Sequence, residues 1–376
     1  MRGLIVEHIS AGGCAIDGDT APVSDHLVQQ GWAMLEAILT DAARTGVRVS
    51  TLVRQAPKNK IEGCDFIVVD DEVALLDRFD SLARQADWVL VIAPETDDAL
   101  TRWLTRIEVL GVRTMNCSVP ATALCGDKLS LGLHLTQAGV KTPQVVRFMD
   151  GDDVDADLWC KQFARVVVKP RYGAGCEQAF CFNGGEVGTQ RERFESCFNS
   201  VHGGTEMIVQ PCVDGDAFSA SYFVNEGDVT LLGVCRQHID FVNEGASCVR
   251  LVYRGGEVVS DAALARRVDR LGKQAVDSIV GLGGFVGVDV VLASSCDAAG
   301  AVCDAEDFVI EINPRLTMSY VGLRAVGDSN LAAGLMGSVE ATRSAQQRLG
   351  KLDGTRNKDG RTGFVQFNTA GVIDDD

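Results

Sequence analysis

The strongest constraint on the fold is a regular alternation of short apolar runs with amphipathic stretches in the first third of the chain. The apolar runs have strand length and lie at Leu4–Glu7, Val47–Val53, Phe66–Asp70 and Trp88–Ala93. Segments with apolar residues at helical spacing lie at Leu27–Arg44, Val73–Gln85 and Ala99–Leu110. Strands that alternate with helices predict βαβ units, and hence a parallel sheet with helices on its faces.

From Arg165 onward the pattern changes to serial strands with glycine-rich turns. The predicted strands lie at Val166–Pro170, Met207–Pro211, Phe218–Val224, Val229–Asp240, Ser247–Tyr253, Phe285–Ala293 and Asp307–Asn313, with a helix at Ala262–Val280. Serial strands joined by turns favour antiparallel pairing. The sequence therefore predicts an α/β region followed by an α+β region.

The two regions are joined by a stretch of different character. The alternating pattern breaks near Gly111–Pro120, which predicts the first domain boundary. A helix is expected at Asp127–Ala138, because Gly139 and Pro143 follow it as stop signals. The acidic stretch Asp150–Asp157 predicts a solvated loop or a helix start, not a metal cluster.

Charge and composition exclude several classes of partner. The 376 residues include 35 Lys and Arg against 52 Asp and Glu, a formal net charge of −17. Phosphate backbones and anionic lipids would be repelled, so neither nucleic acid nor a membrane is an expected partner. No apolar run approaches the roughly 18 residues that span a bilayer, and the start lacks a signal-peptide core. The 13 cysteines form no CxxC pair, which predicts reduced thiols in a soluble cytoplasmic protein.

A lysine at the end of an apolar strand begins the first candidate site. Val166–Val168 leads into Lys169, and Gly173 and Gly175 follow. Lysine supplies a point charge, and glycines let backbone N–H groups approach anionic oxygens, so the segment suits a phosphate clamp. The residue order is not that of a P-loop, and a purely structural turn stays open.

Polar residues inside two apolar strands indicate a second candidate site. Glu311 and Asn313 project to one face of their strand because they are two residues apart, and Asp289 lies within the preceding strand. If the strands are neighbours, three oxygen-bearing side chains converge, which suits Mg²⁺ bound to nucleotide phosphates. The alternative is that Glu311 is a paired buried carboxylate.

A third candidate is the bend after Ile208–Gln210. A strand that leaves a core exposes backbone groups suited to an adenine edge, and Asp216 follows as an acid suited to ribose hydroxyls. The order of all these pieces resembles the ATP-grasp superfamily over roughly Asn116 to Met336. The matching elements are Lys128, Lys169 with its glycine loop, the Gln210–Asp216 bend, Asp289 and the EINPR segment Glu311–Arg315.

The resemblance implies a fold and a role for each matched residue. The implied domains are a Rossmann-like parallel-sheet domain at 1–115 and two ATP-grasp lobes with mostly antiparallel sheets at 116–205 and 206–376. ATP would contact Lys128, Lys169, Arg171, Gly173, Gly175, Gln210, Val213 and Asp216. Mg²⁺, or Mn²⁺ as a substitute, would bind Asp289, Glu311 and Asn313, and the catalytic residues would be Lys169 and Arg315. Pro211 departs from the family pattern, because many relatives have Glu there and proline has no N–H for adenine.

The N-terminal third resembles the Rossmann-like domain that precedes ATP-grasp in ligases. Gly12-Gly13 follows its first strand, but GxGxxG is not satisfied, so a nucleotide fingerprint and a tight turn both stay open. This opening and the MSYVGLR segment after EINPR are similar to tyramine–glutamate ligases of methanofuran-type cofactor synthesis. Arg236 and His238 lie two residues apart in a predicted strand, where they either bind a substrate carboxylate or lie on a solvated face of the strand. Cys176 is either a reactive thiol or part of the packing of its loop.

The resemblance implies an ATP- and Mg²⁺-dependent carboxylate–amine ligase. It would form an amide through an acyl phosphate from small-molecule substrates, such as glutamate and tyramine or a related amine, and a homodimer stays open. Phosphoryl transfer needs positioning and charge more than a nucleophile, and no nucleophile–base pair is legible. A non-catalytic ATP-binding regulatory subunit has no need of the full ligand set with Arg315. A nicotinamide-dependent oxidoreductase would need a complete glycine fingerprint.

Overall fold

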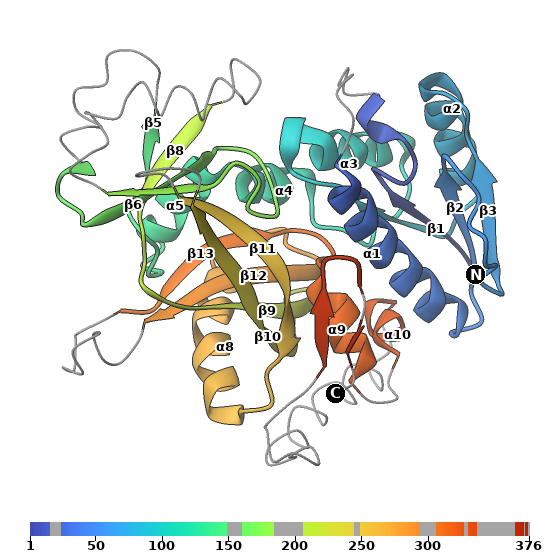
Figure 1. The fold of residues 1–376 in the computed structure, drawn as a ribbon. Helices are drawn as coiled ribbons and strands as arrows, with labels where there is room; N and C mark the ends of the chain where they lie inside the picture. Colours follow the sequence, from blue (N-terminus) through green and yellow to red (C-terminus); the bar gives the residue numbers. More distant parts are fainter. Residues whose placement is uncertain are drawn as a thin grey trace.

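The computed structural model describes residues 1–15, 24–148, 160–183, 206–243, 249–293, 306–326, 330–336, 365–371 and 373–374. These residues form two β-sheets with helices packed around and between them (Figure 1). The acidic stretch Asp150–Asp157, expected as a solvated segment, lies outside the described residues.

The first sheet consists of the four apolar runs at the start of the chain. Its parallel strands lie in the order β3-β2-β1-β4 and span Arg2–Glu7 (β1), Arg48–Val53 (β2), Cys64–Val68 (β3) and Trp88–Ile92 (β4). The helices between them are α1 (Asp25–Ala43), α2 (Glu72–Ala83) and α3 (Ala99–Leu110), with short 3₁₀ turns at Gly13–Ala15 and Thr96–Asp98. This arrangement confirms the expected parallel α/β region.

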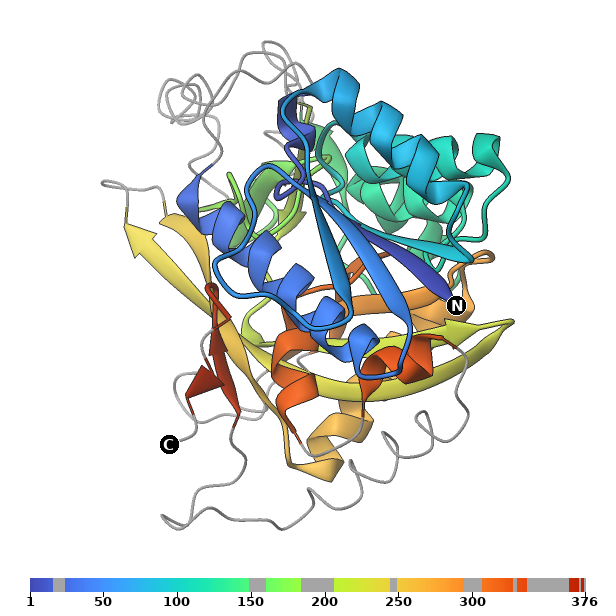
Figure 2. The ribbon, with the colours of Figure 1, turned by 90° about the vertical axis from the view of Figure 1, so that its right-hand side faces the viewer.

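Alternation along β1 places its side chains in two separate cores. Ile5 packs with α1 on one face, whereas Leu4 and Val6 pack with α2 and α3 on the other. The helices therefore flank both faces of the sheet (Figure 2). This layering leaves the carboxyl ends of β1 and β4, adjacent in the sheet, free to carry polar residues.

The second sheet has eleven strands over the described residues, and all its pairs are antiparallel. The main path is β13-β12-β9-β10-β11-β7-β6-β8-β5, and β14 pairs with β11 and β15. The strands are Val146–Phe148 (β5), Arg165–Pro170 (β6), Phe180–Asn183 (β7), Met207–Pro211 (β8), Gly215–Asn225 (β9), Asp228–Asn243 (β10), Val249–Val258 (β11), Gly284–Ala293 (β12), Phe308–Asn313 (β13), Gln366–Asn368 (β14) and Ile373–Asp374 (β15). The antiparallel pairing confirms the expected fold class.

Five further helices accompany this sheet: α4 (Val119–Gly126), α5 (Lys128–Gln137), α8 (Ala262–Asp277), α9 (Ser319–Ala325) and α10 (Leu331–Leu335). Helix α5 begins after Asp127, whose carboxylate accepts the backbone N–H groups of Leu129 and Ser130. Helix α4 lies where the periodicity breaks and was not expected. Its apolar residues form no clear stripe, but Ser118 caps it and Pro120 occupies its first turn.

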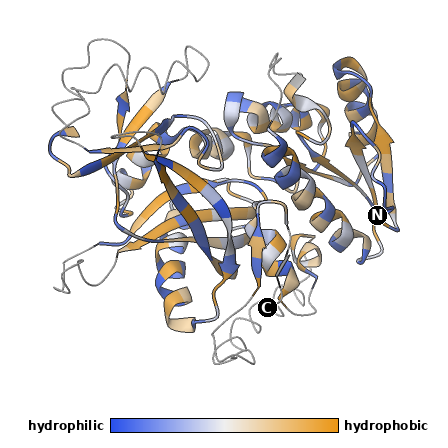
Figure 3. Ribbon diagram, viewed as in Figure 1, coloured by the Kyte–Doolittle hydropathy of each residue, from blue (hydrophilic) through white to orange (hydrophobic). Residues whose placement is uncertain are grey.

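The two sheets share a hydrophobic core. Ile5 and Leu35 of the first region pack in one cluster with Phe223, Phe285 and Tyr320 of the second. The strands of both sheets carry hydrophobic stretches, drawn in orange, that are interrupted by polar residues, drawn in blue (Figure 3). Because α1 lies against α9 and α10, the N-terminal region is fixed against the lobe that carries β12 and β13.

The described helices include none with the length and apolar character needed to cross a membrane. Nine cysteines lie in the described ranges, and all nine are free thiols, as expected for those positions.

Candidate active site

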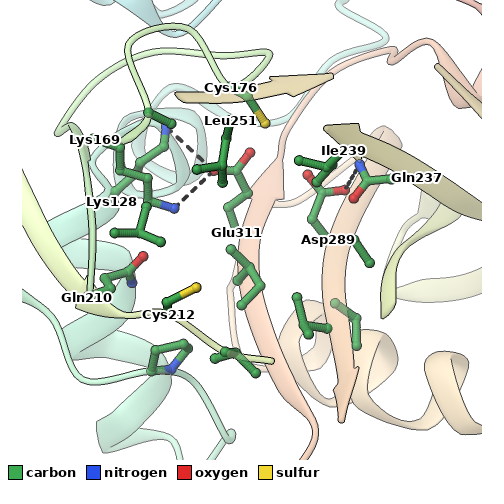
Figure 4. A pocket seen from close by; sticks show the side chains of 18 of the residues that line it. Lys128, Lys169, Cys176, Gln210, Cys212, Gln237, Ile239, Leu251, Asp289 and Glu311 are labelled. Carbon is green, nitrogen blue, oxygen red and sulfur yellow. Dashed lines mark hydrogen bonds and ion pairs between the residues drawn. The ribbon is translucent and has the colours of Figure 1, made fainter. Parts of the chain in front are cut away.

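Two lysines and one glutamate from three different elements meet between the lobes. Lys128 is the first residue of α5, Lys169 lies near the end of β6, and Glu311 lies in the middle of β13. Each lysine Nζ is 3.7 Å from Glu311 Oε2 (Figure 4). The structure thus brings together two predicted phosphate ligands and one predicted metal ligand.

Burial and charge act against each other in this cluster. Burial lowers the pKa of Lys169, and the nearby Glu311 carboxylate opposes that effect. Burial would raise the pKa of Glu311, but the charges of Lys128 and Lys169 outweigh it and lower the pKa. The cluster therefore holds one carboxylate against two ammonium groups, which leaves positive charge for an anionic ligand.

The remaining predicted metal ligands lie beside Glu311. Asp289 of β12 is paired with Glu311 in the register of the two strands. Asn313 Nδ2 donates a hydrogen bond to Asp289 Oδ2 over 3.0 Å, and Gln237 Nε2 donates one to Asp289 Oδ1 over 3.1 Å (Figure 4). Burial, followed by the charge of Glu311, raises the pKa of Asp289, as expected for a buried carboxyl group beside a second carboxylate.

This donor set fits a hard divalent cation. It offers two carboxylates and an amide oxygen, the ligand types that Mg²⁺ takes together with waters and phosphate oxygens. Among the described residues, no group of three or more His, Cys, Asp or Glu side chains has the arrangement of a self-sufficient metal site. With two carboxylates and one amide oxygen, an ion here would take its remaining ligands from water and nucleotide phosphates.

A cavity of about 290 Å³ extends from this cluster between the lobes. Seven residues predicted to bind ATP or metal line it besides Glu311: Lys128, Lys169, Gly173, Gln210, Val213, Asp216 and Asp289. Apolar side chains such as Ile239 and Leu251 line it as well, and Figure 4 shows Gln210 and Cys212 beside the bend after β8. A mostly apolar pocket with charges at one end suits a flat base with an attached polyphosphate.

Arg171 has a different place from the one expected of a phosphate contact. It is absent from the residues lining this cavity, and its guanidinium binds Asp127 through two hydrogen bonds and Glu206 through a third, of 2.7 Å. Burial alone would raise the pKa of Asp127, but hydrogen bonds from Arg171 and Ser130 hold it at about 2. Because Arg171 O also accepts the backbone N–H of Lys128, the arginine here positions the lysine.

Two other predicted residues are engaged by partners within the chain. The Arg315 guanidinium binds both carboxylate oxygens of Glu95, over 2.9 and 3.0 Å, and both residues are buried. Asp216, the predicted ribose ligand, forms a 2.9 Å ion pair with Arg236. Arg236 also lies over the ring of Phe218, and neither of these two residues is among those that line the cavity.

The predicted metal ligands Asp289, Glu311 and Asn313 are called the metal-type cluster below. A second cavity, of about 120 Å³, lies between the first sheet and this cluster. Asp289 and Glu311 line both cavities, so the two meet at this cluster. Its walls include Arg315 and Asn313 on one side and Glu7 with α1 on the other. Gly175 lines this cavity and adopts φ +68°, a conformation that favours glycine.

The structure bears on two alternatives that the sequence left open. The backbone N–H groups of Gly12 and Gly13 donate to Ile9 O and His8 O, so Gly12-Gly13 forms a tight turn. Burial, followed by the charge of Glu311, raises the pKa of Cys176 to about 12, which argues against a reactive thiol.

Three site residues were missed by reasoning from the sequence. Glu7 is the last residue of β1 and Glu95 follows β4, the adjacent buried strand, at the edge where an open parallel sheet binds ligands. That shared position was a usable signal. Gln237 carries no comparable signal, since it is one polar residue among several in β10 and only the sheet order brings it to Asp289.

Fold and site together define a class of protein: two lobes with a cavity between them, and lysine and carboxylate side chains where that cavity meets a second one. The model of the ATP-grasp domain matches residues 125–319, more than half of the chain, and that of the pre ATP-grasp 3 domain matches residues 47–122. The chain belongs to the ATP-grasp family.

Similar proteins include tyramine–L-glutamate ligases and structurally characterised ATP-grasp proteins. The chain is 25% identical to the tyramine–L-glutamate ligase of Methanocaldococcus jannaschii, and the match covers 80% of each chain. It is 26% identical to the tyramine–L-glutamate ligase of Methanocaldococcus fervens, and that match covers 70% of this chain and 71% of the other. An ATP-grasp superfamily protein from Archaeoglobus fulgidus matches with a TM-score of 0.61 and 23% identity over 90% of this chain and 88% of the other. The D-alanine–D-alanine ligase of Bacillus anthracis matches with a TM-score of 0.57 and 14% identity over 93% and 98%. These findings confirm the expected class: the protein is an ATP-dependent ligase.

Proposed function

We propose that this enzyme joins the carboxylate of a small acid to an amine through an acyl phosphate, with glutamate and tyramine, or a related amine, as the substrates. The observation that carries the proposal is the cluster of Lys128, Lys169 and Glu311 at the junction of two cavities. The larger cavity has the size and lining for ATP, and the smaller one has room for an acid at the phosphate end.

In this proposal the lysines hold the phosphates while the acid attacks. A carboxylate oxygen of the acid forms a bond to the γ-phosphorus, the bond to the β-phosphate oxygen breaks, and ADP leaves. The amine nitrogen then attacks the acyl carbon, phosphate leaves, and the nitrogen loses its proton. Lys128 and Lys169 supply fixed positive charge where the phosphoryl group transfers, and no protein nucleophile is needed.

The metal site and Arg315 complete the charge balance. Asp289, Glu311 and Asn313 would hold Mg²⁺, or Mn²⁺ in its place, and the ion would neutralise charge on the phosphate oxygens. Arg315 lies on the wall of the smaller cavity and is held by Glu95. In this proposal its guanidinium would stabilise the transferring phosphoryl group.

The substrate assignment rests on the curated relatives and on the smaller cavity. Two proteins named tyramine–L-glutamate ligase match 70% or more of the chain. The cavity wall combines charged groups with apolar side chains of α1, such as Leu27 and Met34. That mixture suits an acid with a short chain. A cytoplasmic location, a homodimer and the boundaries 1–115, 116–205 and 206–376 stay predictions.

Trapping the activated acid tests the reaction class. With ATP, Mg²⁺ and L-glutamate, added hydroxylamine is expected to give a hydroxamate together with ADP and phosphate, without any amine. With tyramine in place of hydroxylamine, L-glutamate is expected to give the fastest ADP release in a panel of acid–amine pairs. Mn²⁺ should support the reaction, and a chelator should stop it.

Each contrary result removes a different part of the proposal. AMP and pyrophosphate as products would show adenylation and refute the acyl phosphate. A phosphorylated protein that survives gel filtration would show a phosphoenzyme instead. A different acid–amine pair that wins by tenfold or more would replace the substrates and leave the ligase chemistry in place.

A further inference from the structure

A buried carboxylate of the first sheet lines the same small cavity as Asp289, Glu311 and Asn313 of the second sheet. Glu7 is the last residue of β1, is 2% exposed and lines this cavity. Its Oε1 accepts the backbone N–H of Ile9 over 3.0 Å, and its Oε2 accepts that of Ser10 over 2.7 Å. These two bonds, together with one from the Ser10 side chain, fix the carboxylate in place without neutralising its charge.

The charge of Glu7 has no basic partner in the part of the chain that is described. Within those residues, neither a lysine nor an arginine forms an ion pair with it, and the nearest basic group in sequence is His8. Burial raises the pKa of Glu7, in opposition to the hydrogen bonds that it accepts. Because a buried carboxylate is costly unless it is paired, the site is suited to a cation that arrives with a ligand.

Helix α1 is shaped to accommodate this carboxylate. Gly31 lies on the cavity wall, and a Cβ atom at that position would sit 2.5 Å from Glu7 Oε2. A glycine inside a helix costs about 1 kcal/mol relative to alanine. The helix therefore carries an unfavourable residue where the backbone must approach the carboxylate, a second feature that singles out Glu7.

The smaller cavity is lined both by Glu7 and by residues at the predicted phosphate end, and its volume suits a single small molecule. A volume of about 120 Å³ accommodates one small molecule, since a liquid water occupies about 30 Å³. Asp289, Glu311 and Arg315 line the same cavity as Glu7. Glu7 and the residues of the predicted phosphate end thus belong to one cavity that a single small molecule would fill.

We propose that Glu7 binds the ammonium group of the acid substrate, so that the enzyme activates an amino acid and rejects the corresponding acid that lacks the ammonium. This inference rests on the proposed function, since it takes the smaller cavity as the place where the acid is phosphorylated. An ammonium group supplies three N–H donors and a full positive charge, which match the remaining acceptor capacity of the carboxylate.

The test compares L-glutamate with glutarate, its analogue without the ammonium group, in the hydroxylamine assay. That assay contains no amine substrate, so it reports on the acid alone. The wild-type enzyme should prefer glutamate strongly. Glu7→Gln should reduce that preference by about 10- to 100-fold, the range expected when a charged hydrogen bond is lost. The reduction should come from a higher KM for glutamate, while the KM for glutarate changes little.

Two further variants separate recognition from structure. Glu7→Asp keeps the charge and should keep part of the preference. Gln30→Ala changes an uncharged residue on the same wall and should alter the rates with both acids alike. Binding of ADP with Mg²⁺ to each variant, together with its melting temperature, checks that the fold is intact.

The proposal about Glu7 fails if Glu7→Gln lowers the rates with both acids equally, because the carboxylate then only supports the turn after β1. It also fails if glutamate kinetics are unchanged and only the KM for tyramine rises. If glutamate is not a substrate, twenty amino acids and their deaminated analogues are compared in the same way. If only acids that lack an ammonium group are active, the role of Glu7 is refuted and the ligase reaction stands. If no acid gives a hydroxamate, the proposed function is refuted, and the role of Glu7 with it.

Discussion

Replacement of Lys169 by alanine is expected to lower hydroxamate formation by about 10²- to 10³-fold, the usual cost of removing one fixed charge from a phosphoryl or acyl transfer site. Lys169 Nζ lies 3.7 Å from Glu311 at the junction of the two cavities, and the residue is 8% exposed. Its charge therefore acts at a site largely shielded from water. Lys128 remains in the variant and still balances Glu311, so the fold should be retained.

A lysine away from the cavities provides the matched control. Lys141 forms an exposed ion pair with Glu306, and Lys141→Ala should leave the rate of hydroxamate formation within about twofold of wild type. The rate is measured as hydroxamate formed per enzyme at saturating ATP and Mg²⁺. A Lys169→Ala variant that keeps its fold and more than a tenth of the activity would show that Lys169 does not act on the transferring group.

The parts of the fold that follow from a strong local pattern could be predicted from the sequence. Strands β1 to β4, β6 and β8 to β13, and helices α1, α2, α3, α5 and α8, coincide closely with the apolar runs and helical patterns of the sequence. The short strands β5, β7, β14 and β15 were not predicted. Helix α4 has apolar residues without a stripe, and its burial depends on packing against α3, α5 and β13. Such an element is set by tertiary contacts, which a local pattern does not contain.

The candidate site shows the same division between local and distant information. The spacing of Glu311 and Asn313 places both on one face of β13, and the register of β12 and β13 then brings Asp289 to them. The partner of Arg315 is different. Glu95 lies 220 residues earlier, in the loop after β4, and only the packing of the first sheet against the second brings the two together.

The MSYVGLR segment has a structural role that its sequence did not reveal. Two of its residues, Tyr320 and Arg324, bind the Asp41 carboxylate of α1: the tyrosine hydroxyl donates over 2.9 Å, and the guanidinium donates over 2.7 and 3.0 Å. Asn330 Nδ2 donates to Asp41 O over 2.6 Å. Asp41 therefore joins the N-terminal region to the lobe that carries β12 and β13, and so helps to hold both walls of the smaller cavity.

Replacement of Asp41 by alanine is expected to lower the free energy of unfolding by about 3 kcal/mol, the lower end of the cost of breaking a buried ion pair. The Asp41 side chain is 4% exposed, and its loss leaves the half-buried Arg324 and the buried Tyr320 hydroxyl without their carboxylate partner. Asp65→Ala is the matched control, because it removes an aspartate from the exposed Arg48–Asp65 pair and should cost less than about 1 kcal/mol. Urea unfolding of both variants measures the difference. If the two variants are equally stable, Asp41 does not join the two regions in solution, and the walls of the smaller cavity are held by the apolar core alone.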